Sequence, residues 1–167
     1  MSAIELLIVD LDKCFFDTFS IPIDDDAGAL IPDSAKTYGD ERHLAKIKIN
    51  KILITAGRRE RQLAKAAKVN AERFFQKIIV VPSAAHKEAA FEAEMRVAGL
   101  SPWQIAVLGD NPLSELGAGK RLRMHTVQTL RPTIDRWEEA DFHISSFSEL
   151  EGVLAVMEER NRALALM

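Results

Sequence analysis

The sequence predicts a three-layer α/β/α fold, Rossmann-like, with a central parallel sheet. After residue 50, apolar runs of strand length alternate with helical stretches, and such alternation implies βαβ units. Two runs, at 6–9 and 105–108, are apolar throughout, as in strands buried on both faces. The first run ends at Asp10 and Asp12, and the second is followed by Asp110. We expect the strand before Asp10 in the middle of the sheet.

Six strands are expected from apolar runs between turn residues. They lie at 6–9, 51–55, 77–82, 105–108, 124–128 and 141–144, the last near an edge of the sheet. Helices are expected between them. They lie at 58–69, at 85–98, where Phe91, Met95 and Ala98 follow a helical spacing, and at 112–122, with Asn111 as cap and Pro112 in the first turn.

Two serines are expected to begin helical turns. Ser101, with Gln104 three residues later, predicts a single turn before the next strand. Ser146, with Glu149 three residues later, predicts the start of the last helix. That helix is expected to bury Phe147, Leu150, Leu154 and Met157.

The segment 18–50 does not follow the alternation. It holds the acidic run at 24–26, two prolines and two glycines, with a modest helical pattern only at 43–49. We interpret it as a minimal cap or loop within a single domain spanning 1–167, and the acidic run as a solvated loop. A chain of this length is one domain by the usual prior.

Bulk composition excludes several classes of protein. With 22 basic and 25 acidic residues, the chain offers no electrostatic case for binding nucleic acid. Its single cysteine, Cys14, rules out an intramolecular disulfide and suits a reducing cytoplasm. No apolar run approaches a membrane span, and the first residues do not form a signal peptide. We expect a cytoplasmic protein without a membrane partner.

The carboxylates after the two apolar runs are the strongest chemical signal. Asp10 and Asp12 are two apart on an extended chain, so both side chains can face one ligand. In such a pair one carboxylate can attack or bind a metal while the other transfers a proton. The alternative is a pair of turn acids, because aspartate is common where strands end. Gly109 permits a tight turn before Asp110, and Glu115 lies about one helical turn further on. Acids gathered at the carboxyl ends of parallel strands need a cation, and Mg²⁺ suits oxygen ligands.

Two weaker signals lie between these motifs. Thr55, Ala56 and Gly57 form a strand-to-helix turn whose hydroxyl and N–H groups could bind an anion, or simply cap the helix. Arg58 follows directly, with Arg59 and Arg61, and could contact an acidic substrate or lie on an exposed helix face. Lys87 stands near the start of the next helix, where a lysine is often only solvated.

In this order, the set Asp-x-Asp, Thr, Lys and Gly-Asp-Asn resembles the haloacid dehalogenase (HAD) superfamily of phosphotransfer enzymes, from Ile4 to about Glu149. The resemblance implies an HAD-like fold and a Mg²⁺-dependent phosphatase acting through an aspartyl-phosphate. It implies these roles: Asp10 as nucleophile, Asp12 as general acid and base, Thr55 with Ala56, Gly57 and Arg58 as phosphoryl or substrate contacts, Lys87 as the neutralising cation, and Asp10, the Asp12 carbonyl, Asp110 and Glu115 as metal ligands. Dehalogenases of the superfamily lack the second acid, so Asp12 favours phosphatase chemistry.

The chain departs from the superfamily pattern after Asp12. Lys13 and Cys14 stand where Gly and Thr are usual, which keeps open a non-catalytic HAD-fold protein that binds a phosphorylated ligand or a protein partner. We expect Lys13 to act on both acids of the first motif. A phospho-accepting receiver domain is a third alternative, but it would have its Thr and Lys after the last Asp.

The short intervals between the motifs resemble those of capless members. An open site implies a phosphorylated macromolecule that covers it, or a neighbouring subunit of a homo-oligomer. A phosphorylated small molecule is the other expected substrate.

Overall fold

Six strands form one sheet in which every pairing between neighbouring strands is parallel. The computed structural model describes residues 3–167, apart from the side chain of Asp25. In chain order the strands are β1 (Leu6–Val9), β2 (Asn50–Ala56), β3 (Lys77–Val81), β4 (Ile105–Gly109), β5 (His125–Thr129) and β6 (Phe142–Ile144). Across the sheet they run β3-β2-β1-β4-β5-β6, so β1 lies inside and β6 at an edge. The predicted fold class is confirmed.

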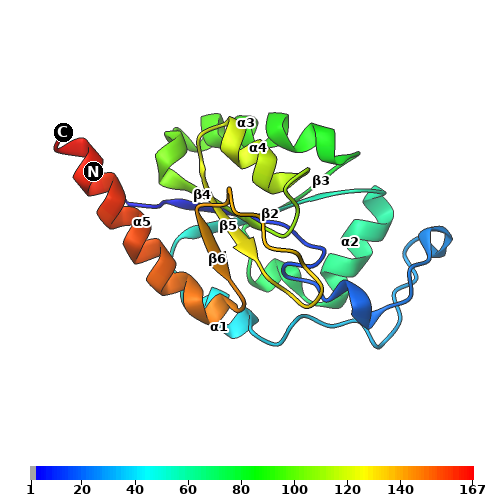
Figure 1. Cartoon of the computed structure of the whole chain (residues 1–167). Helices are drawn as coiled ribbons and strands as arrows, with labels where there is room; N and C mark the ends of the chain where they lie inside the picture. The colour runs from blue at the N-terminus through cyan, green and yellow to red at the C-terminus, as the bar shows by residue number, and fades with distance from the viewer. Residues whose placement is uncertain (1–2) are drawn as a thin grey trace.

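Helices cover both faces of the sheet (Figure 1). They are α1 (Glu41–Lys46), α2 (Arg59–Lys68), α3 (Lys87–Ala98), α4 (Glu115–Arg121) and α5 (Leu150–Ala165). Side chains alternate along β1, so Leu6 and Ile8 pack on the side of α3 and α4, whereas Leu7 and Val9 pack on the side of α1, α2 and α5. Burial on both faces explains why this run carries no polar residue.

Both predicted capping boxes are confirmed. Ser101 with Gln104 and Ser146 with Glu149 each form the reciprocal pair of side-chain-to-backbone hydrogen bonds. The first closes a single 3-10 turn before β4, and the second leads through a 3-10 turn into α5. The side chains predicted to be buried there are buried: Phe147, Leu150, Leu154 and Met157.

The helix predicted at 112–122 begins later than expected, because α4 starts at Glu115. Asn111 Oδ1 accepts a hydrogen bond from the N–H of Leu113 at 2.9 Å, and its carbonyl accepts one from Ser114 at 3.2 Å. The prediction that Asn111 caps a helix opening at Pro112 was wrong, since the Asn111 side chain closes a separate turn first.

The segment 18–50 projects from the body of the molecule only in its first part, which lies beside α2 and precedes α1 (Figure 1). An antiparallel bridge between Phe16 and Thr37 closes its base. Its helix, α1, lies slightly earlier than the predicted 43–49. After α1 ends, the ammonium of the buried Lys51 satisfies two backbone carbonyls of the following turn. Its Nζ donates to the carbonyls of Ile47 and Ile49, at 2.5 and 3.0 Å. The role of the segment as a minimal cap stays a prediction.

A buried arginine ties this segment to the rest of the fold. Arg131 donates to both carboxylate oxygens of Asp40, at 2.6 and 3.1 Å, and twice to the carbonyl of Cys14. Its guanidinium lies 4.2 Å from the ring centroid of Tyr38 and 4.7 Å from that of Phe147. Burial opposes ionisation of Asp40, but hydrogen bonds from Arg131 and from the Phe147 N–H lower its pKa. Three segments distant in sequence therefore meet on one side chain.

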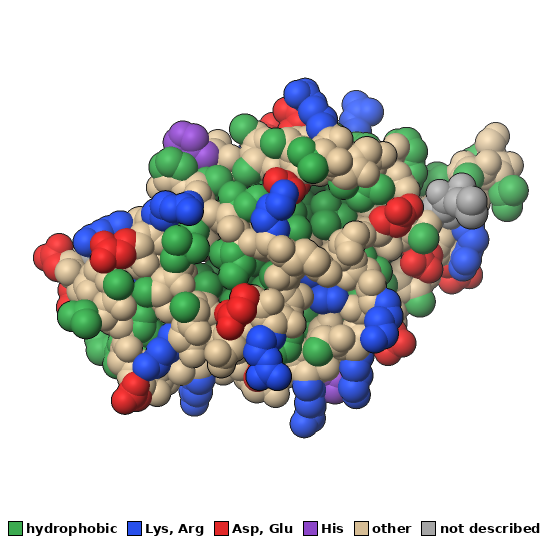
Figure 2. All heavy atoms as spheres, turned by 180° about the vertical axis from the view of Figure 1, so that it is seen from behind, with side chains coloured by type: hydrophobic (Ala, Val, Ile, Leu, Met, Phe, Trp, Pro, Cys, Tyr) green, Lys and Arg blue, Asp and Glu red, His purple; other side chains and the backbone are tan. Residues whose placement is uncertain are grey.

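The surface seen from behind mixes both signs of charge (Figure 2). Lys and Arg alternate with Asp and Glu around this face, and apolar side chains lie across its middle. This face therefore carries no extended field of one sign. Within residues 3–167, no helix combines the length and apolar character that crossing a bilayer requires.

Arg131→Met should lower the free energy of unfolding by about 3 kcal/mol or more, because it leaves the Asp40 carboxylate buried without its partner. Urea denaturation followed by circular dichroism measures the loss. Arg136→Met is the matched control: the ion pair of Arg136 with Glu138 is exposed, and its loss should cost less than about 0.5 kcal/mol. Equal losses in the two variants would contradict the assigned role of Arg131.

Candidate active site at the carboxyl edge of the sheet

The parallel register brings the carboxyl ends of three strands together. Val9 of β1 pairs with Leu53 of β2 and with Leu108 of β4. The polar residues that follow or end these strands lie at adjacent positions along one edge of the sheet: Asp10, Thr55 and Asp110. Ligand sites of open parallel sheets lie at this edge.

Lys87 lies buried between two carboxylates at this edge. Its Nζ donates to Asp10 Oδ1 at 2.8 Å and to Glu115 Oε2 at 2.9 Å. The side chains of Lys87, Asp10 and Glu115 are only 3, 8 and 2 % exposed. Burial alone would lower the pKa of Lys87, but the two carboxylates raise it, so the ammonium stays charged.

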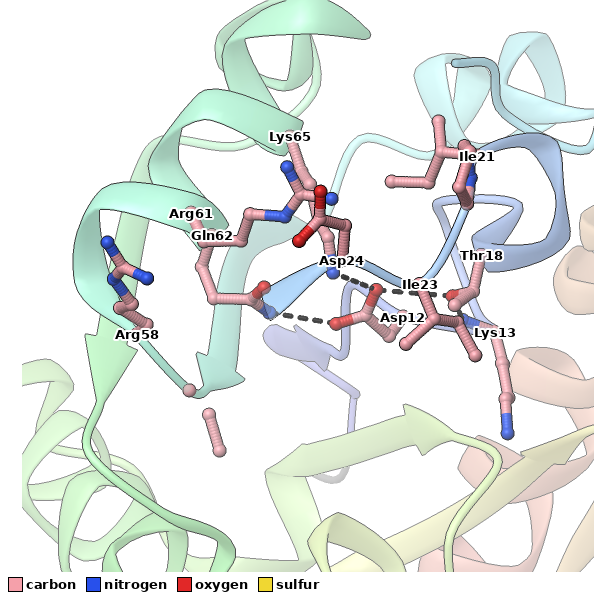
Figure 3. Close-up of a pocket in the computed structure, with 13 residues that line it drawn as sticks. Asp12, Lys13, Thr18, Ile21, Ile23, Asp24, Arg58, Arg61, Gln62 and Lys65 are labelled. Carbon is pink, nitrogen blue, oxygen red and sulfur yellow. Dashed lines mark hydrogen bonds and ion pairs between the residues drawn. The ribbon is translucent and has the colours of Figure 1, made fainter. Parts of the chain in front are cut away.

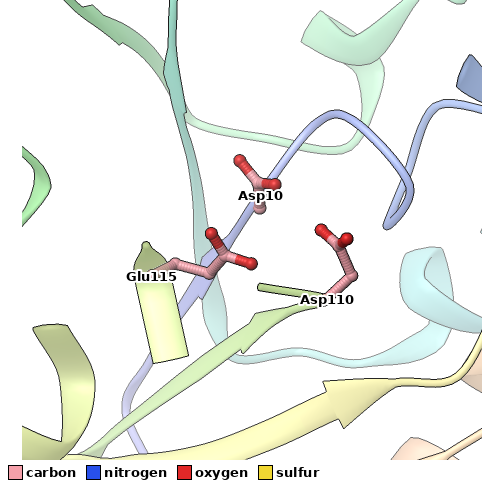
Figure 4. Close-up of side chains that lie close together, drawn as sticks. All are labelled: Asp10, Asp110 and Glu115. Carbon is pink, nitrogen blue, oxygen red and sulfur yellow. The ribbon is translucent and has the colours of Figure 1, made fainter. Parts of the chain in front are cut away.

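Asp10, Asp110 and Glu115 converge on one point (Figure 4). One carboxylate oxygen from each lies within 4.8 Å of the others. When all three are ionised, they carry two more negative charges than the single ammonium of Lys87 offsets, and a divalent cation would balance them. Hard oxygen ligands of this kind fit Mg²⁺. The Asp12 carbonyl as a further ligand stays a prediction.

The acids of this cluster resist ionisation in the absence of a cation. Burial, and then the charge of Glu115, raise the pKa of Asp10 well above its usual value. The same two causes raise the pKa of Asp110 to about 7. A cation that binds here must therefore displace protons below neutral pH.

Gly109 leaves the space that Glu115 occupies. A Cβ at position 109 would lie 2.1 Å from Glu115 Oε1, closer than any side chain permits. The same oxygen accepts a hydrogen bond from the N–H of Asn111 at 2.8 Å. The absence of a side chain at Gly109 thus lets Glu115 reach back to the strand end.

The carboxylate of Asp12 accepts three hydrogen bonds from side chains (Figure 3). Gln62 Nε2 donates to Asp12 Oδ2 at 2.8 Å and also to Thr55 Oγ1 at 2.6 Å. Lys65 Nζ and Thr18 Oγ1 donate to Asp12 Oδ1, at 2.9 and 3.1 Å. Asp12 is therefore held in place by α2 and by the segment that follows the first motif.

Sequence reasoning missed Gln62, Lys65 and Thr18. Gln62 and Lys65 stand three residues apart, so they share one face of α2, and that spacing is the signal the sequence contains. It could not indicate which acid they would meet, because Asp12 is 53 residues away from Lys65.

The predicted substrate turn is partly engaged with the protein itself. Thr55 is buried beneath Gln62, and the N–H of Gly57 donates to the carbonyl of Val81 at 2.9 Å. Arg58 is exposed, with its guanidinium 3.7 Å from Glu60. Roles of Thr55, Ala56, Gly57 and Arg58 toward a substrate stay predictions.

The expected exposed face of arginines is wrong for Arg61. This side chain is 8 % exposed, and its Nη1 donates to the carbonyl of Leu30 at 2.8 Å. Arg61 therefore attaches the projecting segment to α2.

The two departures from the superfamily pattern have different consequences. Lys13 has a φ of 56°, a left-handed conformation that glycine adopts without strain. Its charge acts on Asp110, where it opposes the rise of the pKa caused by burial and Glu115. Cys14 is fully buried, and burial raises the pKa of its thiol, which does not suit a nucleophile.

Solved structures with the same architecture include HAD-like hydrolases. An HAD-like family hydrolase from Xanthomonas campestris aligns with a TM-score of 0.74 at 11% identity, over 97% of this chain and 95% of its own. The HAD-hydrolase YfnB of Bacillus subtilis, bound to magnesium, aligns at 0.72 and 13%, over 91% and 99%. The chain has an HAD-like fold. A 2-haloacid dehalogenase from Pseudomonas syringae pv. Tomato aligns at 0.70 and 14%, over 92% and 99%.

Neither a protein-family model nor a curated protein matches the chain by sequence. The resemblance predicted from the motifs is therefore confirmed through the HAD-like fold. At these identities the likeness establishes the fold alone.

Mg²⁺ should bind more tightly as pH rises through about 7, because below that pH the ion displaces a proton from Asp110, whose pKa burial and the charge of Glu115 raise to about 7. Calorimetric titration about one pH unit below and above that value, in buffers of different ionisation enthalpy, measures both affinity and proton release.

Asp110→Asn should weaken Mg²⁺ binding by about tenfold or more, since it removes a charged ligand. Asp33→Asn is the control, because Asp33 is exposed and pairs only with Lys68 among the described residues. Equal weakening by the two substitutions would rule out the site.

Lys13→Gly should raise the free energy of unfolding by up to about 1 kcal/mol through relief of the left-handed conformation. It should also tighten Mg²⁺ binding by removing a competing cation near Asp110. Lys13→Gln removes the charge but keeps the strain, so it should tighten Mg²⁺ binding without stabilising the fold. Urea denaturation and calorimetry separate the two effects, and a Gly variant no more stable than the Gln variant would contradict the strain.

Proposed function

We propose that this protein is a Mg²⁺-dependent phosphatase that acts through an aspartyl-phosphate on Asp10. The observation that carries the proposal is the buried ammonium of Lys87, bonded to both Asp10 and Glu115, beside Asp110. One fixed positive charge and two further acids that could hold a cation therefore lie beside the carboxylate of Asp10. Phosphoryl transfer needs chiefly positioning and positive charge around the phosphoryl oxygens.

The HAD-like fold supports the proposal. The fold is shared with YfnB, a hydrolase whose structure contains magnesium. A magnesium ion held by Asp10, Asp110 and Glu115 would supply positive charge to the phosphoryl oxygens. Dehalogenases share the fold as well. The second acid, Asp12, favours the phosphatase because an alcohol leaving group needs a proton.

In the proposed reaction an oxygen of Asp10 attacks phosphorus, and the bond from phosphorus to the alcohol oxygen breaks. The alcohol oxygen takes a proton from Asp12. Asp12 then removes a proton from water, whose oxygen attacks phosphorus and releases phosphate and Asp10. Lys87 holds the carboxylate of Asp10 in one orientation through its 2.8 Å hydrogen bond. Gln62, Lys65 and Thr18 do the same for Asp12.

A second candidate is a non-catalytic protein that binds a phosphorylated ligand. The surroundings of Asp12 favour this candidate. Three side chains already donate hydrogen bonds to its two carboxylate oxygens, so they leave little room for the proton that a general acid carries. A cytoplasmic location suits either candidate, since the one thiol, Cys14, is unpaired.

Asp10→Asn should abolish release of phosphate from p-nitrophenyl phosphate in the presence of Mg²⁺, because an amide cannot act as the nucleophile. Lys87→Met should lower kcat by about 100-fold or more through loss of the positive charge. Circular dichroism should show the folded state in Asp10→Asn, and Asp33→Asn should keep the wild-type rate.

Wild-type-like turnover by Asp10→Asn would exclude Asp10 as nucleophile. A wild-type protein that binds phosphate with Mg²⁺ yet hydrolyses no aryl or alkyl phosphate would leave the second candidate.

A further inference from the structure

A second cavity adjoins the acid site. The cavity at the acid site has a volume of about 260 Å³, and its neighbour about 460 Å³, a size that suits a small molecule. Asp12, Lys13 and Ala56 line both, so the two meet beside the proposed proton donor. An ester whose phosphoryl group lies against Asp10 would direct its alcohol part past Asp12 into the larger cavity.

One wall of the larger cavity is apolar and comes from the projecting segment. It consists of the consecutive residues Ile21, Pro22 and Ile23. Ile21 packs in the core, whereas Ile23 is 86 % exposed, so its apolar surface lines the space without a protein partner covering it. Figure 3 shows Ile21 and Ile23 on one side of the Asp12 carboxylate. An apolar group that covers Ile23 would remove this surface from water, which is favourable.

Hydrogen bonds hold the apolar wall in place from both ends. Before it, Ser20 Oγ donates to the carbonyl of Asp17 at 2.6 Å and accepts from the N–H of Lys36 at 3.1 Å. After it, Arg61 Nη1 donates to the carbonyl of Leu30 at 2.8 Å. A wall that is already positioned costs a ligand less ordering, and this favours binding.

The charged side chains that line the larger cavity interact with the protein itself. Those of α2 and the residue before it have these partners: Asp12 for Lys65 at 2.9 Å, the Leu30 carbonyl for Arg61 at 2.8 Å, and Glu60 for Arg58 at 3.7 Å. Asp24 Oδ1 accepts a hydrogen bond from the N–H of Asp26 at 3.0 Å. Lys13 also lines the acid site, where its charge acts on Asp110. What the cavity offers a ligand beyond these interactions is the apolar wall.

We propose that the larger cavity binds the alcohol part of the substrate, and that this part is an uncharged, largely apolar group that packs against Pro22 and Ile23. The inference rests on the proposed function, since it assigns the substrate class of the same site. An apolar group displaces water from the wall and leaves the pairs of the charged side chains intact. A charged group would have to compete with those pairs for a partner.

The test compares two phosphonates, which bind but are not cleaved. Butylphosphonic acid and (3-hydroxypropyl)phosphonic acid have the same charge and nearly the same length, and they end in a methyl and a hydroxyl group. Calorimetry with Mg²⁺ should give butylphosphonic acid about tenfold tighter binding, because burial favours the methyl group and opposes a hydroxyl without a partner.

Ile23→Ser should reduce this ratio to about threefold or less, because it removes the apolar surface that the butyl chain covers. Leu113→Ser is the matched control, since Leu113 is 93 % exposed and lines neither cavity. Both substituted side chains are exposed, so both variants should keep the fold, which circular dichroism checks.

Equal affinity of the two probes, no binding of either, or a ratio that Leu113→Ser lowers as much as Ile23→Ser does would overturn the inference. Hydrolysis of p-nitrophenyl phosphate and of butyl phosphate is measured separately. Equal affinities in a protein that hydrolyses either ester overturn the substrate class alone. A retained preference for butylphosphonic acid without hydrolysis of either ester supports the cavity assignment and overturns the phosphatase.

Discussion

The ammonium of Lys87 holds the acidic edge of the sheet together. Without it, Asp10 and Glu115 would be buried close together with no fixed positive charge beside them. Burying unpaired charges lowers the free energy of unfolding. Lys87 offsets only one of the three negative charges of the cluster. The ionised cluster therefore has two negative charges that Lys87 does not offset. A divalent cation would balance them, and this is the basis of the proposed chemistry.

Several residues around this edge of the sheet orient its carboxylates. Gly109 removes the side chain that would block Glu115, and the N–H of Asn111 orients the Glu115 carboxylate. Gln62 donates to both Asp12 and Thr55 and so links the end of β2 to the residues that follow β1. Arg131 donates to the carbonyl of Cys14, just beyond the first motif, and so connects the site to Asp40, which precedes α1, and to Ser145, which follows β6. Such second contacts decide how well a first set of ligands is oriented.

The projecting segment forms one wall of the space beside the acid site. Arg61 attaches this segment to α2. The apolar residues at 21–23 line a cavity that adjoins the cavity at the acid site. An entirely open site would have favoured a macromolecule or a neighbouring subunit as the missing wall. Because the chain supplies this wall itself, we favour a phosphorylated small molecule over a macromolecule as the proposed substrate.

The sequence by itself determined the sheet, its parallel sense and the acids at its edge. Strands buried on both faces must be apolar throughout, and a carboxylate directly after such a strand can lie only at the sheet edge. The capping boxes at Ser101 and Ser146 were equally readable, since their partners lie three residues away. The start of α4 was not, because the side chain of Asn111 could close a turn or cap a helix with the same local sequence. Only the tertiary structure decided that Lys65 and Gln62 meet Asp12, and that Arg131 meets Asp40 across 91 residues. These pairings depend on how each helix is rotated and seated on the sheet, and packing of the whole core sets that rotation.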